Sequence, residues 1–367
     1  MLKGKALNVT QTYNAEAQEY LSKAVKLDPK LVEGWVQLGE SYWKQGDISD
    51  AKNCFEGALS HSKDKVALRN LSMVLRQLGS DAAERGRFIA ESVEKAKEAL
   101  QLDIKDGTSW LILGNAYLSQ FFMGGQNPKI VKLCFSAYQQ AERDPVANCN
   151  PDLHYNRAMA YKYQEDYQLA LTGFARALAL DPSWGMPKQQ ERELMQYLTQ
   201  LHDLMQRKGK LRAKKLHAMV NSIRESDLGP YSGGSYTGAN GTVVTLTKCT
   251  LGDLQPGVNV EKVVLGKVVC SLNTADRVPF IFCLLDKTST CFAVTVYNMA
   301  DGQGVKIGDS VAIAEPFLQI VDVAFGKLEL NYKSIRVDSP LVMVVNGRKL
   351  GAEKQALTSL SLVAKSE

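Results

Sequence analysis

Several signatures of common protein classes are missing from this chain of 367 residues. No apolar run reaches the roughly 18–20 residues that a membrane-spanning helix needs. The N-terminus, residues 1–5, has no apolar core of the kind found in secretory signals. The seven cysteines form no CxxC pair, which favours reduced, mostly buried thiols over disulfides or zinc ligands. We therefore expect no secretion, no membrane partner and no metal site.

Enzyme signatures are missing as well. The chain has no P-loop, no HExxH, no GxSxG, and no GxGxxG after a predicted strand. Its four histidines, at positions 61, 154, 202 and 217, are far apart in the sequence, and no nucleophile–base pair is recognisable. Glu165 and Asp166 fall at a predicted helix turn, where we expect both carboxylates to face solvent. We therefore predict a protein that is not an enzyme and needs no cofactor.

The charge is small and unevenly placed. The chain carries 44 Lys+Arg against 39 Asp+Glu, a net charge of +5. Much of the excess lies in residues 207–215, where six of nine side chains are basic. This segment falls within a long polar–apolar helix that we predict over residues 190–207 and then 211–224. Two roles remain open for this segment: a solvated helix face near a domain end, or a contact for RNA or another acidic partner.

The first half of the chain repeats itself. Segments 24–29, 99–103 and 177–182 read alike, and a tryptophan lies 11 residues after the first alanine in two of them, at Trp35 and Trp110. The residues between them fit the tetratricopeptide repeat (TPR) consensus W-x2-L-G-x2-Y…A-x3-F…P, of about 34 residues. We therefore predict an all-α TPR solenoid over residues 1–227, closed by a C-terminal capping helix.

The predicted array begins irregularly. Ala17, Leu21 and Ala24 fit the second helix of a pair, but only residues 2–9 remain for the first helix. An uncapped terminal repeat exposes apolar surface. We therefore expect a truncated first repeat, and it stays open whether Met1 is the true start.

The sequence pattern changes beyond residues 228–241, a glycine-rich segment that we predict to be a linker. Five later segments are rich in β-branched and aromatic residues and are separated by turn residues: Val260–Ser271, Phe280–Leu285, Cys291–Tyr297, Ser310–Glu315 and Ser334–Val345. About five strands over ~110 residues fit a small Greek-key barrel. We predict an all-β OB-fold barrel over residues 242–350 and a tail over 351–367.

The ligand of the predicted barrel stays open. OB barrels often bind single-stranded nucleic acid through a basic groove and stacking aromatics. Residues 240–350 carry 11 basic and 10 acidic side chains, so they lack the excess of positive charge that nucleic-acid binding usually needs. We therefore keep nucleic-acid binding as a weaker alternative, and several of the aromatics are equally expected in the core.

The concave face of a TPR solenoid is lined by the first helix of each pair. Counting each unit from its consensus positions places Arg76, Asn115, Asp152 and Tyr155 on this face. Side chains of both charge signs beside an aromatic ring suit an extended peptide that also carries both signs. We therefore predict a peptide-binding groove.

Short stretches distributed over both halves carry a family resemblance. They are Asn70–Leu78, Gly125–Lys129, Asn150–His154, Leu254–Asn259, Leu265–Val269, Ile307–Ile313 and Val344–Gly347. With these stretches and its domain order, the chain resembles the tetratricopeptide repeat protein 5 (Strap) family. The resemblance implies recognition of the Met-Arg-Glu-Cys or Met-Arg-Glu-Ile start of nascent tubulin chains at the ribosome, followed by decay of tubulin mRNA (tubulin autoregulation).

The resemblance also implies roles for peptide-binding residues. Arg76 would contact the glutamate of the tubulin peptide, and Asp152 would contact its arginine. The second acidic contact of the family falls at Met186, which carries no charge. Either Glu191 or Glu193 compensates, or the arginine is recognised more weakly in this chain.

Ribosome-facing lysines of the family match Lys23 and Lys26, three residues apart, where they would meet rRNA phosphate. The implied partners are the nascent tubulin peptide, ribosomal protein and rRNA near the exit tunnel, and a deadenylase-recruiting adaptor. An acetyltransferase coactivator and an actin-nucleation regulator are further implied partners, and the implied location is both cytoplasmic and nuclear. The alternative function is a nuclear, stress-responsive cofactor that scaffolds an acetyltransferase coactivator complex. Oligomeric state stays open.

Overall fold

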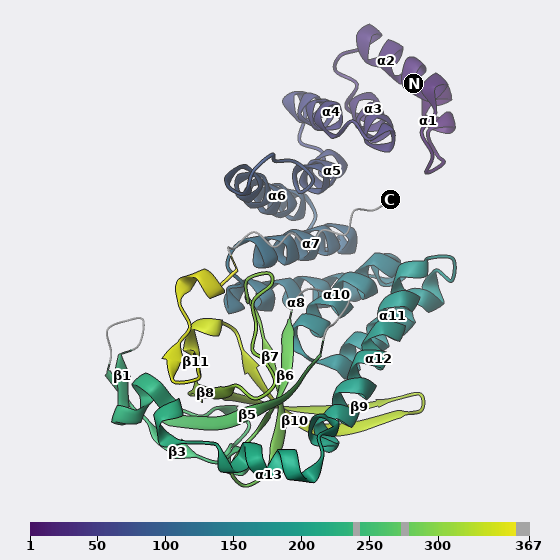
Figure 1. The fold of residues 1–367 in the computed structure, drawn as a ribbon. Helices are drawn as coiled ribbons and strands as arrows, with labels where there is room; N and C mark the ends of the chain where they lie inside the picture. Colours follow the sequence, from purple (N-terminus) through teal and green to yellow (C-terminus); the bar gives the residue numbers. More distant parts are fainter. Residues whose placement is uncertain (238–242, 273–278, 357–367) are drawn as a thin grey trace. The chain divides into compact units, whose positions relative to one another are not determined.

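The computed structural model describes residues 1–237, 243–272 and 279–356 (Figure 1). The chain forms two compact units. The first holds residues 1–160 and 176–183, and the second holds residues 161–175 together with the described residues from 184 onward. None of the described helices combines the length and the apolarity that crossing a bilayer requires.

The first unit is built from helices that pack in sequential pairs, as a TPR array requires (Figure 1). Two of them, α10 and α11, are divided between the two units. The helices are α1 (Leu2–Leu7), α2 (Ala15–Leu27), α3 (Val32–Gln45), α4 (Ile48–His61), α5 (Lys65–Leu75), α6 (Ala82–Leu102), α7 (Gly107–Met123), α8 (Pro128–Glu142), α9 (Pro145–Asn148), α10 (Pro151–Gln164) and α11 (Tyr167–Leu180). The predicted TPR solenoid is confirmed.

Small and large residues alternate where paired helices cross. A side-chain carbon on Gly39 of α3 would lie 2.6 Å from the Phe55 ring of α4, and one on Gly114 of α7 would lie 2.5 Å from the Tyr138 ring of α8. Both rings are fully buried, so only glycine permits this approach of the helices. The consensus glycine and aromatic positions therefore set the helix spacing.

Local signals set the ends of these helices. Asp64 and Asp81 each accept a hydrogen bond from a backbone N–H in the first turn of α5 and α6. Helix α2 ends two residues before Pro29, and α11 ends two residues before Pro182, as the proline positions predict.

The second unit continues with α12 (Gly185–Gln206), a short turn η1 (Lys208–Lys210), α13 (Ala213–Asn221) and a further 3-10 segment η2 (Glu225–Gly233). The long helix predicted over residues 190–207 and then 211–224 consists of two separate helices, and the basic residues 207–215 span the break between them. Lys208, Gly209 and Lys210 all have positive φ, which turns the chain sharply. A side-chain carbon on Gly209 would lie 2.4 Å from the Val269 carbonyl oxygen, so the turn rests directly on the barrel.

The rest of the second unit is a β domain (Figure 1). Its strands are β1 (Ser235–Thr237), β2 (Val243–Thr245), β3 (Thr247–Cys249), β4 (Gly257–Val258), β5 (Lys262–Leu272), β6 (Phe280–Leu285), β7 (Cys291–Val296), β8 (Ser310–Ala314), β9 (Phe317–Phe325), β10 (Leu328–Val337), β11 (Met343–Val345) and β12 (Arg348–Lys349). Two details of the prediction are wrong. Strand β9 was not foreseen, and the segment Ser334–Val345 holds parts of two strands separated by the 3-10 turn η4 (Pro340–Val342).

The strand pairing closes a barrel. β5 pairs with β6 and β8, β6 with β7, β7 with β10 in parallel, and β10 with β9. Only Glu315 and Pro316 separate β8 from β9, so these two strands act as one bent strand that joins β5 on one side to β10 on the other. This ring confirms the predicted OB-type barrel.

The barrel has an inner core and covered outer faces. Val264, Phe282, Val294 and Ile335 are among the residues of the inner core. On the outside, Leu228 and Tyr231 of η2 are buried against β5, β8 and β11. The part of residues 228–241 that precedes β1 is therefore packed on the barrel, while the domain limits proposed from the sequence stay a prediction.

Candidate functional site

Polar residues of neighbouring first helices contact each other at two places in the first unit. Asn70 of α5 donates a hydrogen bond to the Glu40 carboxylate of α3, at 3.0 Å. Further along the array, Asn156 of α10 donates to Asn115 Oδ1 of α7, at 3.1 Å. Successive first helices therefore lie side by side and share a polar surface, which we call the first-helix face and define by these four residues.

Arg76 ends α5 as its C-cap residue and is partly buried. Its Nε donates to the Ser72 carbonyl oxygen at 3.3 Å, and the Tyr138 hydroxyl lies close enough to interact electrostatically. No described carboxylate forms an ion pair with its guanidinium. Burial lowers the pKa of Arg76 to about 10, so the group stays cationic at neutral pH.

Two other arginines of the same unit show the usual arrangement for a partly buried cation. Arg69 pairs with Asp106 at 2.8 Å. Arg157 forms a two-pronged pair with Glu142, at 2.6 and 2.9 Å. A buried charge without such a partner is unfavourable. Arg76 therefore lacks the carboxylate partner that Arg69 and Arg157 have, and a carboxylate of a bound ligand would supply it.

Tyr138, Asn115 and Asn156 connect the region of Arg76 to α10. The fully buried Tyr138 donates to Asn115 Oδ1 at 2.8 Å, and the same oxygen accepts from Asn156. Asp152 precedes Asn156 by one helical turn. Asp152 reaches solvent but is crowded by neighbouring protein, and this desolvation raises the pKa of its carboxyl group.

The other predicted peptide-binding residue lies differently. The Tyr155 side chain is 7% exposed, so its ring packs inside the array. The sequence did not single out Tyr138 or Asn156. Tyr138 could not be distinguished in the sequence from a core residue that packs on Gly114. Asn156 could have been found, because it follows Asp152 by four residues and so lies on the same helix face.

The remaining predicted residues lie on two helices, α2 and α12. Lys23 and Lys26 are exposed on α2, and Lys23 pairs with Glu19 of the preceding turn. On α12, which belongs to the second unit, Met186 and Glu191 are partly buried, and desolvation raises the pKa of Glu191. Glu193 accepts a hydrogen bond from the Gln189 side chain at 2.8 Å. The roles assigned to these residues stay predictions.

A second polar region lies in the second unit, where the turn between α10 and α11 meets the barrel. The expectation that Glu165 faces solvent is wrong, because its side chain is 1% exposed. Arg336 of β10 donates to the Tyr163 carbonyl oxygen at 2.8 Å and pairs with Glu165 at 3.3 Å. The same guanidinium lies over the Tyr297 ring, 4.0 Å from its centroid.

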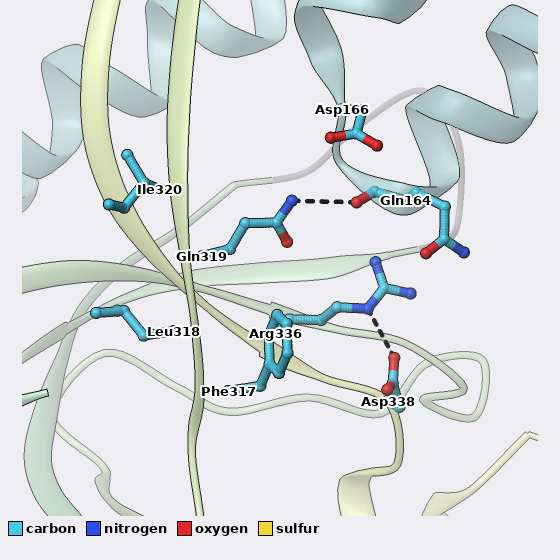
Figure 2. A pocket seen from close by; sticks show the side chains of 8 residues that line it. All are labelled: Gln164, Asp166, Phe317, Leu318, Gln319, Ile320, Arg336 and Asp338. Atoms are coloured by element: carbon cyan, nitrogen blue, oxygen red, sulfur yellow. Dashed lines mark hydrogen bonds and ion pairs between the residues drawn. The ribbon is translucent and has the colours of Figure 1, made fainter. Parts of the chain in front are cut away.

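A cavity of about 450 Å³ opens beside this pair. In Figure 2 the Gln319 side chain points from β9 toward Gln164 and donates to its backbone oxygen at 3.1 Å, while Arg336 donates to Asp338 at 2.8 Å. The cavity is lined by Gln164, Asp166, Phe317, Leu318, Gln319, Ile320, Arg336 and Asp338. Among the lining residues, Arg336 and Gln319 donate their hydrogen bonds to acceptors of the protein itself. These bonds hold the turn between α10 and α11 against the barrel.

Four of the barrel aromatics are buried: Phe282 and Phe292 lie in the inner core, whereas Tyr297 and Tyr332 are covered on the outer side by Tyr163 and His202. Phe282, Phe292, Tyr297 and Tyr332 are each less than one-tenth exposed. Rings in these positions are not available to stack on nucleic-acid bases. His154, the histidine at the start of a predicted repeat helix, is also buried, and its Nε2 lies 2.8 Å from the Asn148 carbonyl oxygen, which is a structural contact.

Comparison with known proteins agrees with this architecture. The family model described as "Tetratricopeptide repeat protein 5 OB fold domain" matches residues 245–359. Tetratricopeptide repeat models match residues 36–99 and 151–184. TPR arrays are protein-interaction modules, so the chain is organised as a protein-interaction adaptor.

Two full-length relatives extend the match over nearly the whole chain. Tetratricopeptide repeat protein 5 of Bos taurus is 53% identical over 363 residues, which covers 98% of this chain and 82% of the relative. The Homo sapiens protein of the same name is 52% identical over the same shares. Among solved structures, a thermophilic TPR protein of Thermus thermophilus matches with a TM-score of 0.41 and 16% identity, over 49% of this chain and 89% of that one. The identity to the two full-length relatives shows that this chain belongs to the tetratricopeptide repeat protein 5 family.

Proposed function

We propose that this chain is a non-enzymatic adaptor that recognises the Met-Arg-Glu-Cys or Met-Arg-Glu-Ile start of nascent tubulins at the ribosome. By recruiting a deadenylase-recruiting adaptor, it triggers co-translational decay of tubulin mRNA in the cytoplasm. Family membership supports the proposal, and so does the polar first-helix face, since it offers side-chain donors and acceptors to an extended peptide.

The observation that carries the proposal is Arg76. It is a desolvated guanidinium that has no carboxylate partner among the described residues. The glutamate at the third position of the tubulin peptide would supply this partner. A bidentate pair between a planar guanidinium and a carboxylate gives both strength and geometric selectivity.

Asp152 is the complementary partner for the arginine at the second position of the peptide. Its carboxylate reaches solvent from the first turn of α10, and Asn156, one turn later, belongs to the first-helix face. Opposite charges on Arg76 and Asp152 would fix the direction of a peptide whose arginine and glutamate are adjacent.

A titration with a labelled Met-Arg-Glu-Cys peptide tests the proposal. We expect Arg76→Ala to weaken binding at least tenfold, which corresponds to about 1.4 kcal/mol. Arg143→Ala is a matched control, because Arg143 is likewise a helix C-cap residue with helical φ and ψ but is exposed. The control variant should bind as the wild type does.

A second peptide separates a direct contact from an indirect effect. Replacing the peptide glutamate by glutamine should weaken binding to the wild type but leave binding to Arg76→Ala unchanged. If Arg76→Ala loses affinity equally for both peptides, or keeps wild-type affinity for the first, the assigned role of Arg76 is wrong.

A further inference from the structure

Three cysteine thiols gather on the outer face of the barrel, away from the residues used above. Cys270 of β5 lies directly opposite Cys283 of β6 in the antiparallel register. Cys291 of β7 is a diagonal neighbour, because its direct partner on β6 is Leu285, two residues after Cys283. The Cys283 thiol lies close enough to both other thiols for their interaction to raise its pKa. We call these three residues the thiol cluster.

A β-bulge places Cys270 in this cluster. Val268 pairs with Leu284, and both belong to the inner core. Strict alternation would then turn Cys270 inward as well. The register shifts between Val268 and Cys270, so Val269 is the extra residue and Cys270 is re-aimed to the outer face beside Cys283.

The turn η1 and helix α12 cover the outer face of these strands. η1 contacts β5 and β6, and α12 contacts β7 and β10. Gly209 of η1 sits on the bulge itself: a side-chain carbon there would lie 2.4 Å from the Val269 oxygen and 3.1 Å from Cys270 Cβ. The bulge that turns Cys270 to the outer face is therefore also the place where η1 packs on the barrel.

Accessibility falls from one edge of the cluster to its centre. Cys291 is partly exposed, Cys270 is 6% exposed and Cys283 is 1% exposed. The hydrogen bond from Cys283 lowers the pKa of Cys270, whereas Cys283 itself has a strongly raised pKa because it donates to its neighbours and is buried. Within the described ranges no group of three or more candidate ligands could hold a metal ion, so these thiols are not a metal site.

We propose that Cys270, Cys283 and Cys291 form an oxidisable thiol site that a peroxide converts into a Cys270–Cys283 disulfide. Hydrogen peroxide oxidises the partly exposed Cys291 thiol to a sulfenic acid and is reduced to water. The Cys283 sulfur then attacks the Cys291 sulfur and displaces the hydroxyl as a second water, which gives a Cys283–Cys291 disulfide. The Cys270 thiolate attacks Cys283 and releases Cys291 as a thiol. Overall, two thiols and one peroxide give one disulfide and two waters.

The strand geometry selects the final bond. Residues directly opposite on antiparallel strands have Cα atoms about 4.5–5.5 Å apart, within the range of about 4.4–6.8 Å that disulfides span. Diagonal neighbours are about 7–8 Å apart and suit a disulfide less well. Exchange from Cys283–Cys291 to Cys270–Cys283 therefore relieves strain and regenerates the accessible thiol.

Peptide mapping of the whole chain tests the proposal. The protein is treated with hydrogen peroxide, alkylated under denaturing, non-reducing conditions and digested. We expect a linked peptide pair containing Cys270 and Cys283 that disappears after reduction. Cys54 and Cys134 are internal controls, because they are buried single thiols whose pKa burial raises to about 12. They should remain alkylatable throughout.

Two variants check the order of steps. Cys291→Ser should slow formation of the Cys270–Cys283 bond at least tenfold, and Cys270→Ser should yield a Cys283–Cys291 bond instead. Circular dichroism of each variant establishes that it is folded. The proposal is overturned if peroxide oxidises the exposed Cys149 while Cys270 and Cys283 of the wild type remain thiols, or if Cys291→Ser forms the bond at the wild-type rate.

Discussion

Arg336 and Glu165 form a buried ion pair across 171 residues of sequence, with 3.3 Å between Nη1 and Oε1. The pair joins β10 of the barrel to the turn between α10 and α11. Glu165 is in the left-handed region, with φ of +64°, and its second carboxylate oxygen has no hydrogen-bond partner among the residues that the structure describes. Burial, only partly offset by Arg336, raises the pKa of Glu165 to about 7.

The raised pKa of Glu165 predicts a stability that declines toward alkaline pH. Between the ordinary pKa of 4.5 and the folded value of about 7, the folded state holds a proton that the unfolded state has lost. The free energy of unfolding should therefore fall as pH rises through this window, by on the order of 2 kcal/mol. Denaturant titrations at pH 5 and pH 8 measure the change.

A matched pair of variants isolates this contribution. Glu165→Gln should lose the decline between pH 5 and pH 8, because glutamine does not titrate. Glu329→Gln alters an exposed carboxylate on the same barrel and should keep it. An unchanged decline in Glu165→Gln would show that another group is responsible.

Gly209 should be far less replaceable than Gly302, although both have φ of +70°. The side-chain carbon of an alanine at position 302 would have no atom within 4 Å. Gly302→Ala should therefore lower the free energy of unfolding only by the cost of placing alanine at positive φ, about 1 kcal/mol. Alanine at Gly209 adds a clash with the Val269 oxygen, which raises the expected loss to about 2–4 kcal/mol. Denaturant unfolding of the two variants gives the comparison, and equal losses would contradict the close packing of η1 on the barrel.

The helical repeats could be predicted because their signals are local. Gly39 and Phe55 occupy consensus positions in one helix pair, and their fit repeats at Gly114 and Tyr138. The barrel was predicted less fully. Its β8–β9 strand bends at Glu315 and Pro316, so the bend resembled a strand end, and β9 went unrecognised.

Other features depend on partners far away in the sequence. Glu165 was expected at the surface because charged residues in turns usually are. Its burial follows from Arg336 and Tyr297, which no local pattern connects to it. In the candidate site, repeat phase placed Arg76, Asn115 and Asp152 on first helices, but the link through Tyr138 required the packing of α8.

The raised pKa of Asp152 predicts a pH dependence of peptide binding. Desolvation moves this pKa above its ordinary value of 3.8, so on acidification Asp152 becomes neutral earlier than a solvated aspartate. The affinity ratio of wild type to Asp152→Asn for the Met-Arg-Glu-Cys peptide should therefore shrink as pH falls toward 4. Titration of the peptide glutamate affects both proteins and cancels in this ratio. A ratio that stays constant would show that Asp152 does not contact the peptide arginine.

The lysine pair of α2 should govern ribosome association without affecting the peptide. Lys23 and Lys26 are exposed and three residues apart, so both could meet phosphate groups from one helix face. We expect the double change Lys23→Glu and Lys26→Glu to abolish cosedimentation with ribosomes, with peptide affinity unchanged. Since two phosphate contacts would be lost, the salt dependence of any residual binding should be shallower by about one to two units of log–log slope.

The array offers a close control for this charge reversal. Lys129 and Lys132 are likewise exposed and three residues apart, on α8. Reversing them changes the net charge by the same amount, so a general electrostatic attraction to rRNA would be weakened equally by both double variants. A specific contact would be lost only with the α2 pair. The α2 variant alone cannot distinguish a specific contact from general charge attraction, because cosedimentation is lost in both cases. Equal loss of cosedimentation in the two double variants would therefore rule out α2 as the ribosome-binding surface.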